Sequence, residues 1–378
     1  MSDATMSPTN TTNRLARDLD DILARTEPLW QELRGQRILI TGATGFFGCW
    51  LLESFAWANR RLNLNAGAVA VSRHPQTLAQ KAPHLASDPA IALHAADVRC
   101  GDFPQGEFSH VIHAATEASA TLNRQTPLVM FDTIVQGTRR ALEFAAASSV
   151  GKFLFVSSGA VYGTQPPQLT HVSESFTGAP DPLDPANAYA EGKRSAELLC
   201  ALAASSSLEI KIARCFTFVG PYMKLDAHFA IGNFIADAMR GGPILVKGDG
   251  FPLRSYLYAS DLAVWLWTIL FQGQSRRAYN VGSEAALNIA TLAREVAGAL
   301  GSGIEVNISS PITPGEPAHR YVPSTARARE ELGLRAEAPL REAVRRTRDW
   351  FSGNTFLEQG ISGPEVSAPE VIGRGTHA

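Results

Sequence analysis

The sequence predicts an α/β protein with a Rossmann-like, doubly wound parallel sheet and a smaller mixed α/β C-terminal lobe. Three observations predict this fold. The 378 residues exceed the usual size of one core, which indicates one large α/β unit with a smaller lobe or two domains sharing a cleft. Short β-branched runs alternate with helical stretches, as in a parallel sheet covered by helices on both faces. A glycine-rich turn, TGATGFFG at 41–48, follows the first of these runs.

The first domain is expected to cover residues 35–216, after an N-terminal extension. Residues 1 to about 13 are rich in Ser, Thr and Asn, which predicts disorder. Residues 15–33 place apolar side chains at helical intervals and predict an appended helix, either over the cleft or at a dimer contact. The predicted strands are RILIT (37–41), AVAVS (68–72), IALHAADV (91–98), HVIHAA (110–115), KFLFVSS (152–158) and EIKIARCF (209–216).

A second lobe is expected over residues 217–352, because the chain changes there to loops punctuated by Pro and Gly. Helices are predicted near 229–240, 287–300 and 338–351. The apolar segment RSYLYASDLAVWLWTIL (254–270) is expected to return to the first core. The tail over 353–378 is rich in Gly, Ser and Pro and is expected to be flexible.

The composition argues against several functional classes. With 34 Lys and Arg against 36 Asp and Glu, no global field attracts nucleic acid or a membrane surface. The four cysteines (Cys49, Cys100, Cys200 and Cys215) form no Cys-x-x-Cys pair and the histidines no His-Glu-x-x-His spacing, so no metal is expected. No targeting segment is visible, and the longest apolar stretch (262–271) is too short to span a bilayer. These features predict a soluble, cytoplasmic protein.

The glycine turn predicts a dinucleotide site. Gly42, Gly45 and Gly48 lie between a predicted strand and the amphipathic run FGCWLLESFAWAN. Glycine allows the backbone to approach a pyrophosphate, and the helix N-terminus offers free N–H groups and a positive dipole end. A tight turn without a ligand is the alternative. The expected cofactor contacts in this turn are Gly42, Thr44, Gly45, Phe46, Phe47 and Gly48.

The end of the second strand bears on the choice between NAD and NADP. An acidic residue there usually holds the ribose 2′-hydroxyl of NAD, but this strand ends in Ser72, Arg73 and His74. Arg73 is suited to pair with a 2′-phosphate, which favours NADP over NAD; otherwise it is an ordinary surface cation. Asp97, at the end of the third strand, is expected to contact the adenine edge or to start a turn.

A tyrosine and a lysine four residues apart, Tyr189 and Lys193 in AYAEGKR, lie on one face of a predicted helix. An ammonium about 4 Å from the phenolate, at an effective dielectric of about 20, favours ionisation by about 4 kcal/mol, or roughly three pKa units. We therefore expect the phenol to exchange a proton near neutral pH, as the oxidation of an alcohol requires. Ser158, at the end of a core strand, is placed to bond the substrate oxygen.

Seven ordered motifs resemble the extended short-chain dehydrogenase/reductases that act on nucleotide sugars, over roughly residues 36–350. They are TGATGFFG, the HAA of VIHAAT, SSGAVYG, the tyrosine and lysine of YAEGK, RCFTFVGP, GDGFPLRSYLYASDLA and YNVGS. The resemblance implies a catalytic set of Ser158, Tyr189 and Lys193, with Lys193 also holding the nicotinamide ribose. It also implies cofactor contacts at Asp97, Val98, Ala114 and Ala115, and substrate contacts at Ser158, Thr217, Asn233, Arg254, Tyr256 and Arg320.

The same resemblance bears on the reaction. Family dehydratases follow the serine or threonine with Asp-Glu, and decarboxylases with Ser-Glu, whereas Gly159 and Ala160 follow Ser158 here. This difference favours a 4-epimerase, with an NADPH-dependent 4-keto-sugar reductase as the alternative. A dehydratase or decarboxylase would need a carboxylate from elsewhere, such as Glu117 or Glu191. A non-catalytic Rossmann sensor would bind dinucleotide without turnover. Family members often dimerise through the tyrosine helix and the one before the serine strand, here about 124–147, so we expect a homodimer.

Overall fold

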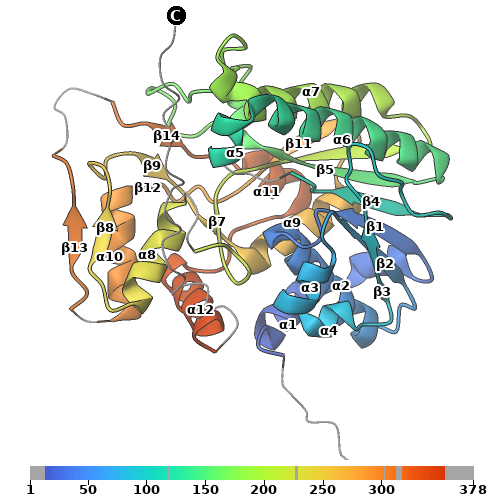
Figure 1. Ribbon diagram of the computed structural model, residues 1–378, viewed down its shortest axis with the longest axis horizontal. Helices are drawn as coiled ribbons and strands as arrows, with labels where there is room; N and C mark the ends of the chain where they lie inside the picture. Colours follow the sequence, from blue (N-terminus) through green and yellow to red (C-terminus); the bar gives the residue numbers. More distant parts are fainter. Residues whose placement is uncertain (1–12, 117–119, 226–228, 302, 312–316, 354–378) are drawn as a thin grey trace, which may run out of the picture.

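The computed structural model describes residues 13–116, 120–225, 229–301, 303–311 and 317–353; side chains are described from 123 onward in the second range. The predicted disordered start and most of the predicted tail lie outside these residues. The central sheet has seven parallel strands in the order β11-β6-β5-β4-β1-β2-β3 (Figure 1). The strands are β1 (Arg37–Thr41), β2 (Gly67–Ser72), β3 (Ile91–Ala95), β4 (His110–His113), β5 (Lys152–Ser158), β6 (Glu209–Cys215) and β11 (Arg277–Val281). The Rossmann-like fold is therefore confirmed.

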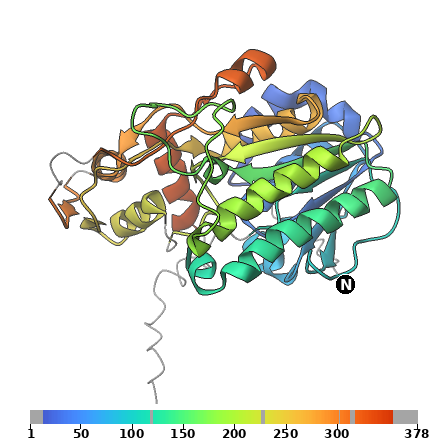
Figure 2. The ribbon, with the colours of Figure 1, turned by 90° about the horizontal axis from the view of Figure 1, so that it is seen from above.

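Each strand of the sheet contributes alternate side chains to two cores, because successive residues of a strand point to opposite faces. Ile38 and Ile40 of β1 pack with α2 (Phe46–Arg61) and α9 (Ala259–Gln272). Leu39 packs on the other face, in the core that includes residues of α6 (Pro127–Ala147) and α7 (Ala188–Ala203). Helices α6 and α7 lie side by side over this face (Figures 1 and 2).

The described part of the N-terminal extension, residues 13–33, packs into the first core. The predicted helix divides into α1 (Ala16–Thr26) and a 3₁₀ turn (Glu27–Leu33), with Pro28 near the start of the turn. Trp30 of this turn packs against Trp267 of α9 with the ring planes tilted by 53° and the centroids 4.6 Å apart. In α1, Asp18 accepts a hydrogen bond from Tyr258 Oη (2.8 Å) and pairs with Arg346 Nη1 (2.5 Å). The extension therefore ties α9 to the C-terminal helix.

The chain between 217 and 352 is shared between a small lobe and the large sheet. Helix α9 and strand β11 belong to the layers of the large sheet. The small lobe includes α8 (Ala230–Met239), α10 (Ile289–Leu300), the parallel pair β8 (Ile244–Val246) and β13 (Val306–Ile308), and the three-stranded sheet β12-β9-β14. The strands of that sheet are β12 (Leu287–Asn288), β9 (Leu253–Arg254) and β14 (Arg320–Tyr321).

The remaining elements connect these layers. They are α3 (Gln76–Lys81), α4 (Pro83–Ala86), α5 (Ala120–Gln125), α11 (Ala326–Leu332), α12 (Leu340–Ser352), the paired strands β7 (Phe218–Val219) and β10 (Leu257–Tyr258), and 3₁₀ turns at Gly159–Tyr162 and Pro185–Asn187. In the part of the chain that the structure describes, no helix is both long and apolar enough to cross a lipid bilayer.

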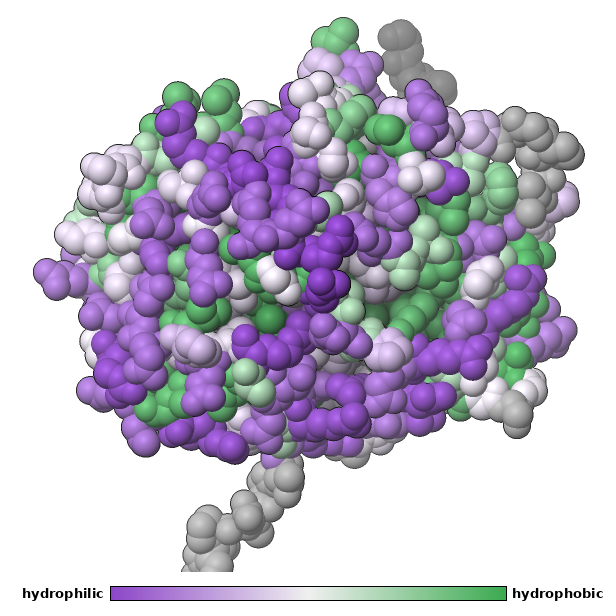
Figure 3. Space-filling model, turned by 180° about the vertical axis from the view of Figure 1, so that it is seen from behind, coloured by the Kyte–Doolittle hydropathy of each residue, from purple (hydrophilic) through white to green (hydrophobic). Residues whose placement is uncertain are grey.

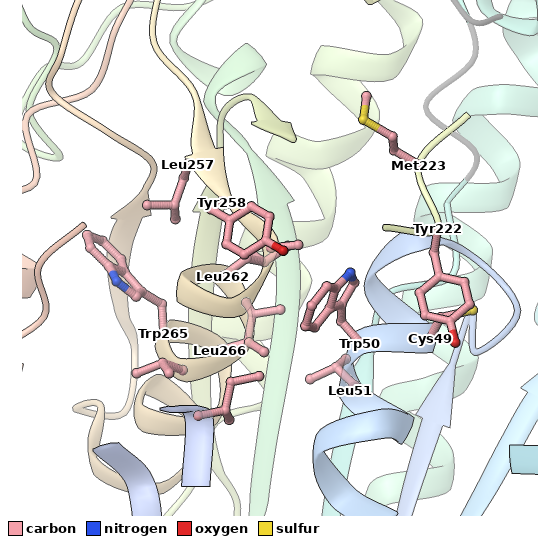
Figure 4. Packing of buried hydrophobic residues seen from close by; sticks show 14 of the residues in the cluster. Cys49, Trp50, Leu51, Tyr222, Met223, Leu257, Tyr258, Leu262, Trp265 and Leu266 are labelled. Carbon is pink, nitrogen blue, oxygen red and sulfur yellow. The ribbon is translucent and has the colours of Figure 1, made fainter. Parts of the chain in front are cut away.

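The core is densest where α2 packs against α9. Trp50 of α2 faces Tyr258, with ring centroids 6.2 Å apart, beside Leu262 and Leu266 (Figure 4). The indole N–H of Trp50 donates to the carbonyl of Pro221 (2.9 Å), so this large buried ring leaves no unpaired donor. On the face shown in Figure 3, hydrophilic side chains surround smaller hydrophobic groups. Apolar side chains therefore gather mainly in the interior.

Candidate active site

The glycine turn lies at the carboxyl ends of β1, β2 and β4. Gly42 has φ +70°, and a Cβ there would stand 2.5 Å from the carbonyl oxygen of Ala114. A Cβ on Gly48 would stand 2.4 Å from Ala43 Cα. Both glycines are required for close packing. Gly42 lets the turn pack on the Ala114–Ala115 segment, and Gly48 lets α2 pack on the turn. The turn and the Ala114–Ala115 segment thereby lie against each other at the carboxyl edge of the sheet, where ligands bind in open α/β folds.

The start of α2 suits a pyrophosphate. Gly45 occupies the N-cap, and no side chain caps this end of the helix. Thr44 Oγ1 lies 2.9 Å from Ser72 Oγ, and the carbonyl of Thr44 accepts a hydrogen bond from Lys81 Nζ (2.9 Å). Phe46 and Phe47 contact each other, and Phe47 meets Phe218 edge to face at 5.1 Å. The uncapped amides, the glycine backbone and the nearby ammonium fit a dinucleotide.

The three other residues predicted to contact the adenosine half lie after β2 and β3. Arg99 holds the Asp97 carboxylate through Nη2 (2.8 Å), and this hydrogen bond lowers the pKa of Asp97. The charge of Arg73 lowers the same pKa, which places Arg73 close to Asp97. Val98 is buried against Gly137 of α6, where an added Cβ would stand 2.8 Å from Val98 Cγ2. The Val98 side chain thus serves in packing.

Ser158, Tyr189 and Lys193 meet at the carboxyl end of β5. Lys193 is only 3% exposed, and its ammonium donates to the carbonyl of Val156 (2.7 Å) and to Thr116 Oγ1 (3.1 Å). Tyr189 shares a side-chain hydrogen bond with Ser158. The i, i+4 spacing on α7 thus brings the tyrosine and the lysine to the strand end, on the side of the sheet where the glycine turn lies.

The expected lowering of the Tyr189 pKa by Lys193 is wrong for this structure. Burial raises the pKa of Tyr189 to about 12, and the hydrogen bond with Ser158 offsets this only in part. Lys193 Nζ lies 5.9 Å from the centroid of the Tyr189 ring and is directed to Val156 and Thr116. Burial also lowers the pKa of Lys193 to about 8. Desolvation is therefore the main cause of both pKa shifts.

A partly buried polar network that the sequence analysis missed lies beside the predicted catalytic residues. Glu197, one turn after Lys193 on α7, accepts a hydrogen bond from Ser157 Oγ (2.6 Å) and pairs with Arg214 Nη2 (2.7 Å). Arg214 also donates to Tyr162 Oη (2.9 Å). The network fixes the end of β5 against β6 and α7. Only the position of Glu197, four residues after Lys193, could have indicated this network from the sequence. The other members of the network are distant in sequence.

The predicted substrate residues do not form one cluster. Arg254 of β9 donates to the carbonyls of Leu253 (2.8 Å) and His319 (3.3 Å). Arg320 of β14 lies opposite Leu253, whereas the next residue, Tyr321, lies opposite Arg254. Because side chains alternate along a strand, Arg254 and Arg320 point to opposite faces of this small sheet.

The other substrate candidates lie around Arg254 and on α8. Thr217 donates a hydrogen bond to the carbonyl of Ser255. Tyr256 lies near enough to Arg254 for the two charges to interact. Asn233 is half-buried on α8. Tyr321 was not predicted, yet its hydroxyl lies 3.4 Å from Ser158 Oγ. Its one sequence signal is its position directly after Arg320.

The two residues after Ser158 carry no acid or base. A Cβ on Gly159 would stand 2.6–2.8 Å from the ring of Phe216, so a side chain there requires Phe216 to move. Glu191 pairs with Arg194 at 3.6 Å, and Glu117 lies outside the described residues. Among the described residues, no carboxylate hydrogen-bonds Ser158, Tyr189 or Lys193, and no group of three or more His, Cys, Asp or Glu side chains is placed to hold a metal.

Comparison with known proteins gives one family match and many relatives. Residues 38–282 match the model of the NAD dependent epimerase/dehydratase family. UDP-glucuronic acid decarboxylase 6 of Arabidopsis thaliana is 30% identical over 310 residues, which cover 82% of this chain and 86% of the relative. A dTDP-glucose 4,6-dehydratase from Streptomyces venezuelae with NAD bound has a TM-score of 0.70 at 24% identity, covering 84% of this chain and 97% of that one. A UDP-glucose 4-epimerase from Thermotoga maritima with UDP-glucose has a TM-score of 0.70 at 20% identity, covering 84% and 99%.

Proposed function

The chain belongs to the NAD-dependent epimerase/dehydratase family, and from this premise we propose that it is a nucleotide-sugar 4-epimerase acting through a transient 4-keto sugar. Membership confirms the enzyme family that the motifs indicate. The proposal for the reaction rests on one observation: Ser158, Tyr189 and Lys193 meet at the end of β5, and no described carboxylate bonds any of them. Hydride and proton transfer need this hydroxyl and amine set, whereas elimination or decarboxylation in the family uses an added acid.

Each residue of the set has a role in moving one proton. The phenol oxygen of Tyr189 takes the proton of the sugar 4-hydroxyl and later returns it to the same oxygen. Ser158 Oγ hydrogen-bonds that oxygen. Lys193 uses two of its three N–H groups on Val156 and Thr116, which leaves the third to orient a ribose hydroxyl. A bound nicotinamide supplies the hydride acceptor and donor, and in its oxidised form a positive charge that favours the phenolate.

The relatives named as decarboxylase and dehydratase favour a lyase, but the residues after Ser158 favour an epimerase. The acidic pair of the dehydratases is replaced by Gly159 and Ala160, and Phe216 fills the space that a side chain at 159 would need. Glu197, one turn after Lys193 on α7, is already held by Arg214 and Ser157. The Glu197 carboxylate therefore has a structural role.

The experiment is to incubate the purified enzyme with UDP-glucose, UDP-glucuronate and dTDP-glucose without added cofactor and to follow the products by NMR. We expect the 4-epimer of at least one sugar, with no release of CO₂ and no 4-keto-6-deoxy product. Mass spectrometry of the denatured protein is expected to show retained dinucleotide. Formation of CO₂ or of a 4-keto-6-deoxy sugar would overturn the assignment in favour of a lyase.

A second candidate, reduction of a 4-keto sugar with NADPH, is favoured by two observations. The pKa of Tyr189 near 12 keeps the phenol protonated near neutral pH, which is the form that donates a proton to a ketone. The chain after β2 carries Arg73 in place of a carboxylate. An enzyme that is isolated without dinucleotide, and that consumes NADPH only with a 4-keto sugar, would fit this reaction.

Replacing Arg73 by alanine is expected to weaken NADP binding by about tenfold or more, since a hydrogen bond between charged groups contributes about 1.5–3 kcal/mol. Affinity for NAD, which lacks the 2′-phosphate, should change by less than about twofold. Isothermal titration calorimetry of wild type and variant with each dinucleotide measures both values. Equal losses for the two dinucleotides would assign Arg73 a structural role.

We propose that the enzyme forms a homodimer through the outer faces of α6 and α7. Leu198 and Leu202, one turn apart on α7, are 60% and 74% exposed, and Leu128 at the start of α6 is 70% exposed. Two neighbouring helices with exposed leucines suit an isologous contact with a second copy. The double variant Leu198→Glu/Leu202→Glu is expected to be a monomer by light scattering. The matched change Leu245→Glu, at an exposed leucine of the small lobe, should leave the dimer intact; a monomeric wild type would contradict the proposal.

A further inference from the structure

The start of α7 is capped by a side chain from another helix. The first amides of a helix have no partner within it, and an asparagine directly before a helix usually accepts a hydrogen bond from one of them. Asn187 occupies this position before α7, but its side chain caps no amide and donates instead to the carbonyl of Asp181 (2.9 Å). The amide of Tyr189 donates to Oδ1 of Asn123, on α5, at 3.0 Å. Asn123 therefore supplies the cap that Asn187 does not.

Asn123 holds the backbone on both sides of this helix start. Its Nδ2 donates to the carbonyl of Ala186 (2.6 Å), in the 3₁₀ turn Pro185–Asn187 that leads into α7. The carboxamide thus offers its N–H group to a carbonyl and its oxygen to an N–H group, which is the pairing that each end requires. The two bonds fix the chain directly before and at Tyr189.

Tyr189 and Lys193 are held in place by different means. The Lys193 ammonium is fixed through its own side chain, which donates two hydrogen bonds at the end of β5. The Tyr189 phenol shares a hydrogen bond with Ser158, and its backbone is fixed at the amide by Asn123. The Cα of Tyr189 is one bond from that amide nitrogen, so a displacement of the amide displaces the phenol as well.

We propose that Asn123 is a positioning residue, whose carboxamide sets the place of the Tyr189 phenol relative to Ser158 by capping α7. This inference rests on the proposed role of Tyr189 in proton exchange and goes beyond it, since it assigns the alignment of that phenol to a residue of α5. Proton transfer requires the phenol within hydrogen-bond reach of the substrate oxygen. A displacement of about 1 Å in a reacting group slows a reaction by up to about 10²-fold. Loss of this cap is therefore expected to lower the rate more than the sugar affinity.

The test replaces Asn123 by leucine, which has a similar volume but forms no hydrogen bond, and by aspartate, which keeps an oxygen for the Tyr189 amide. The substrate is whichever of UDP-glucose, UDP-glucuronate and dTDP-glucose the wild type converts fastest. We expect Asn123→Leu to lower kcat about tenfold or more and to change the Kd of the nucleotide sugar, measured by calorimetry, less than about threefold. Asn123→Asp should retain kcat within about threefold, because a carboxylate also caps a helix N-terminus. An unchanged kcat in Asn123→Leu would refute the role.

A double-mutant cycle separates positioning from a general loss of stability. In the Tyr189→Phe background, Asn123→Leu should lower the residual kcat less than about twofold, because no phenol hydroxyl remains to be placed. The matched control Asn59→Leu removes a carboxamide that likewise bonds a backbone amide and a carbonyl, both of Ala66 (3.0 and 3.1 Å), directly before β2. It should retain wild-type kcat within about twofold. A tenfold loss in both backgrounds, or equal losses in Asn59→Leu and Asn123→Leu, would overturn the proposal.

Hydrogen exchange of the wild type provides a second measurement that does not depend on the folding of a variant. The amide of Tyr189 is expected to exchange at least about tenfold more slowly than an unbonded amide, and exchange at the unbonded rate would refute the cap. The two proposals fail differently. An enzyme that loses kcat in Asn123→Leu and recovers it in Asn123→Asp, but yields no 4-epimer, keeps this inference and loses the reaction. An epimerase with unchanged kcat in Asn123→Leu loses only this inference.

Discussion

The Tyr189→Phe variant is expected to turn over its nucleotide sugar about 10²–10⁴-fold more slowly than wild type, which is the usual contribution of a positioned acid or base. The change removes one hydroxyl and keeps the ring in its partly buried position. Since Tyr189 shares its hydrogen bond with Ser158, no partner is left without an alternative: Ser158 Oγ still accepts from the amide of Ala160 (3.1 Å). The loss should therefore appear in kcat, measured from initial rates by NMR, and not in the unfolding temperature.

Two controls separate chemistry from binding in the Tyr189→Phe variant. Dinucleotide content after denaturation should match that of wild type, because the glycine turn and Lys193 are unchanged. The Tyr279→Phe variant removes a phenol on β11, in a buried position away from the catalytic set, and should retain turnover within about threefold. A Tyr189→Phe enzyme with more than about a tenth of wild-type kcat would show that another group carries the proton.

The sheet could be predicted where each strand contains a short run of apolar residues. The bounds of β1 and β5 agree with the prediction, and β2, β3, β4 and β6 differ from it only at their ends. Strand β11 was not predicted as a strand because RAYNV is short and mixes polar with apolar residues. It forms because it pairs in parallel with the edge of β6. This pairing depends on the tertiary structure and not on the local sequence. The single predicted helix over 15–33 ended early at Thr26 for a local reason, the proline at 28.

The common face of Tyr189 and Lys193 could be predicted from their spacing, but their pKa values could not. Two residues at i and i+4 share a helix face, so the common direction of Tyr189 and Lys193 follows from the sequence. Their pKa values depend on how much water surrounds them, and spacing carries no information about burial. Tyr321 and Arg214 were missed for a similar reason. They reach the site through strands that lie far from Ser158 and Tyr189 in the chain.

The buried ammonium of Lys193 is expected to make the stability of the enzyme depend on pH. Its pKa is about 8 in the folded chain against an ordinary value of 10.5, because the charge lies in the interior with only neutral hydrogen-bond partners. Between these two values the unfolded chain binds more protons than the folded chain, so the free energy of unfolding rises with pH. The penalty on the folded state, about 3 kcal/mol, is fully present below pH 8 and is relieved as the pH rises past 10.

The Lys193→Met variant isolates this effect because methionine fills the site without a charge. The free energy of unfolding of wild type relative to Lys193→Met is expected to rise by about 2 kcal/mol from pH 7 to pH 10. Urea unfolding followed by circular dichroism at both pH values measures the difference. The variant loses the hydrogen bonds to Val156 and Thr116 at both pH values, so this loss cancels in the change between them. The variant Lys247→Met, at an exposed lysine of the small lobe, controls for removal of a lysine. A difference between wild type and Lys193→Met that does not change with pH would mean that water reaches the ammonium and that the site is less buried than its packing indicates.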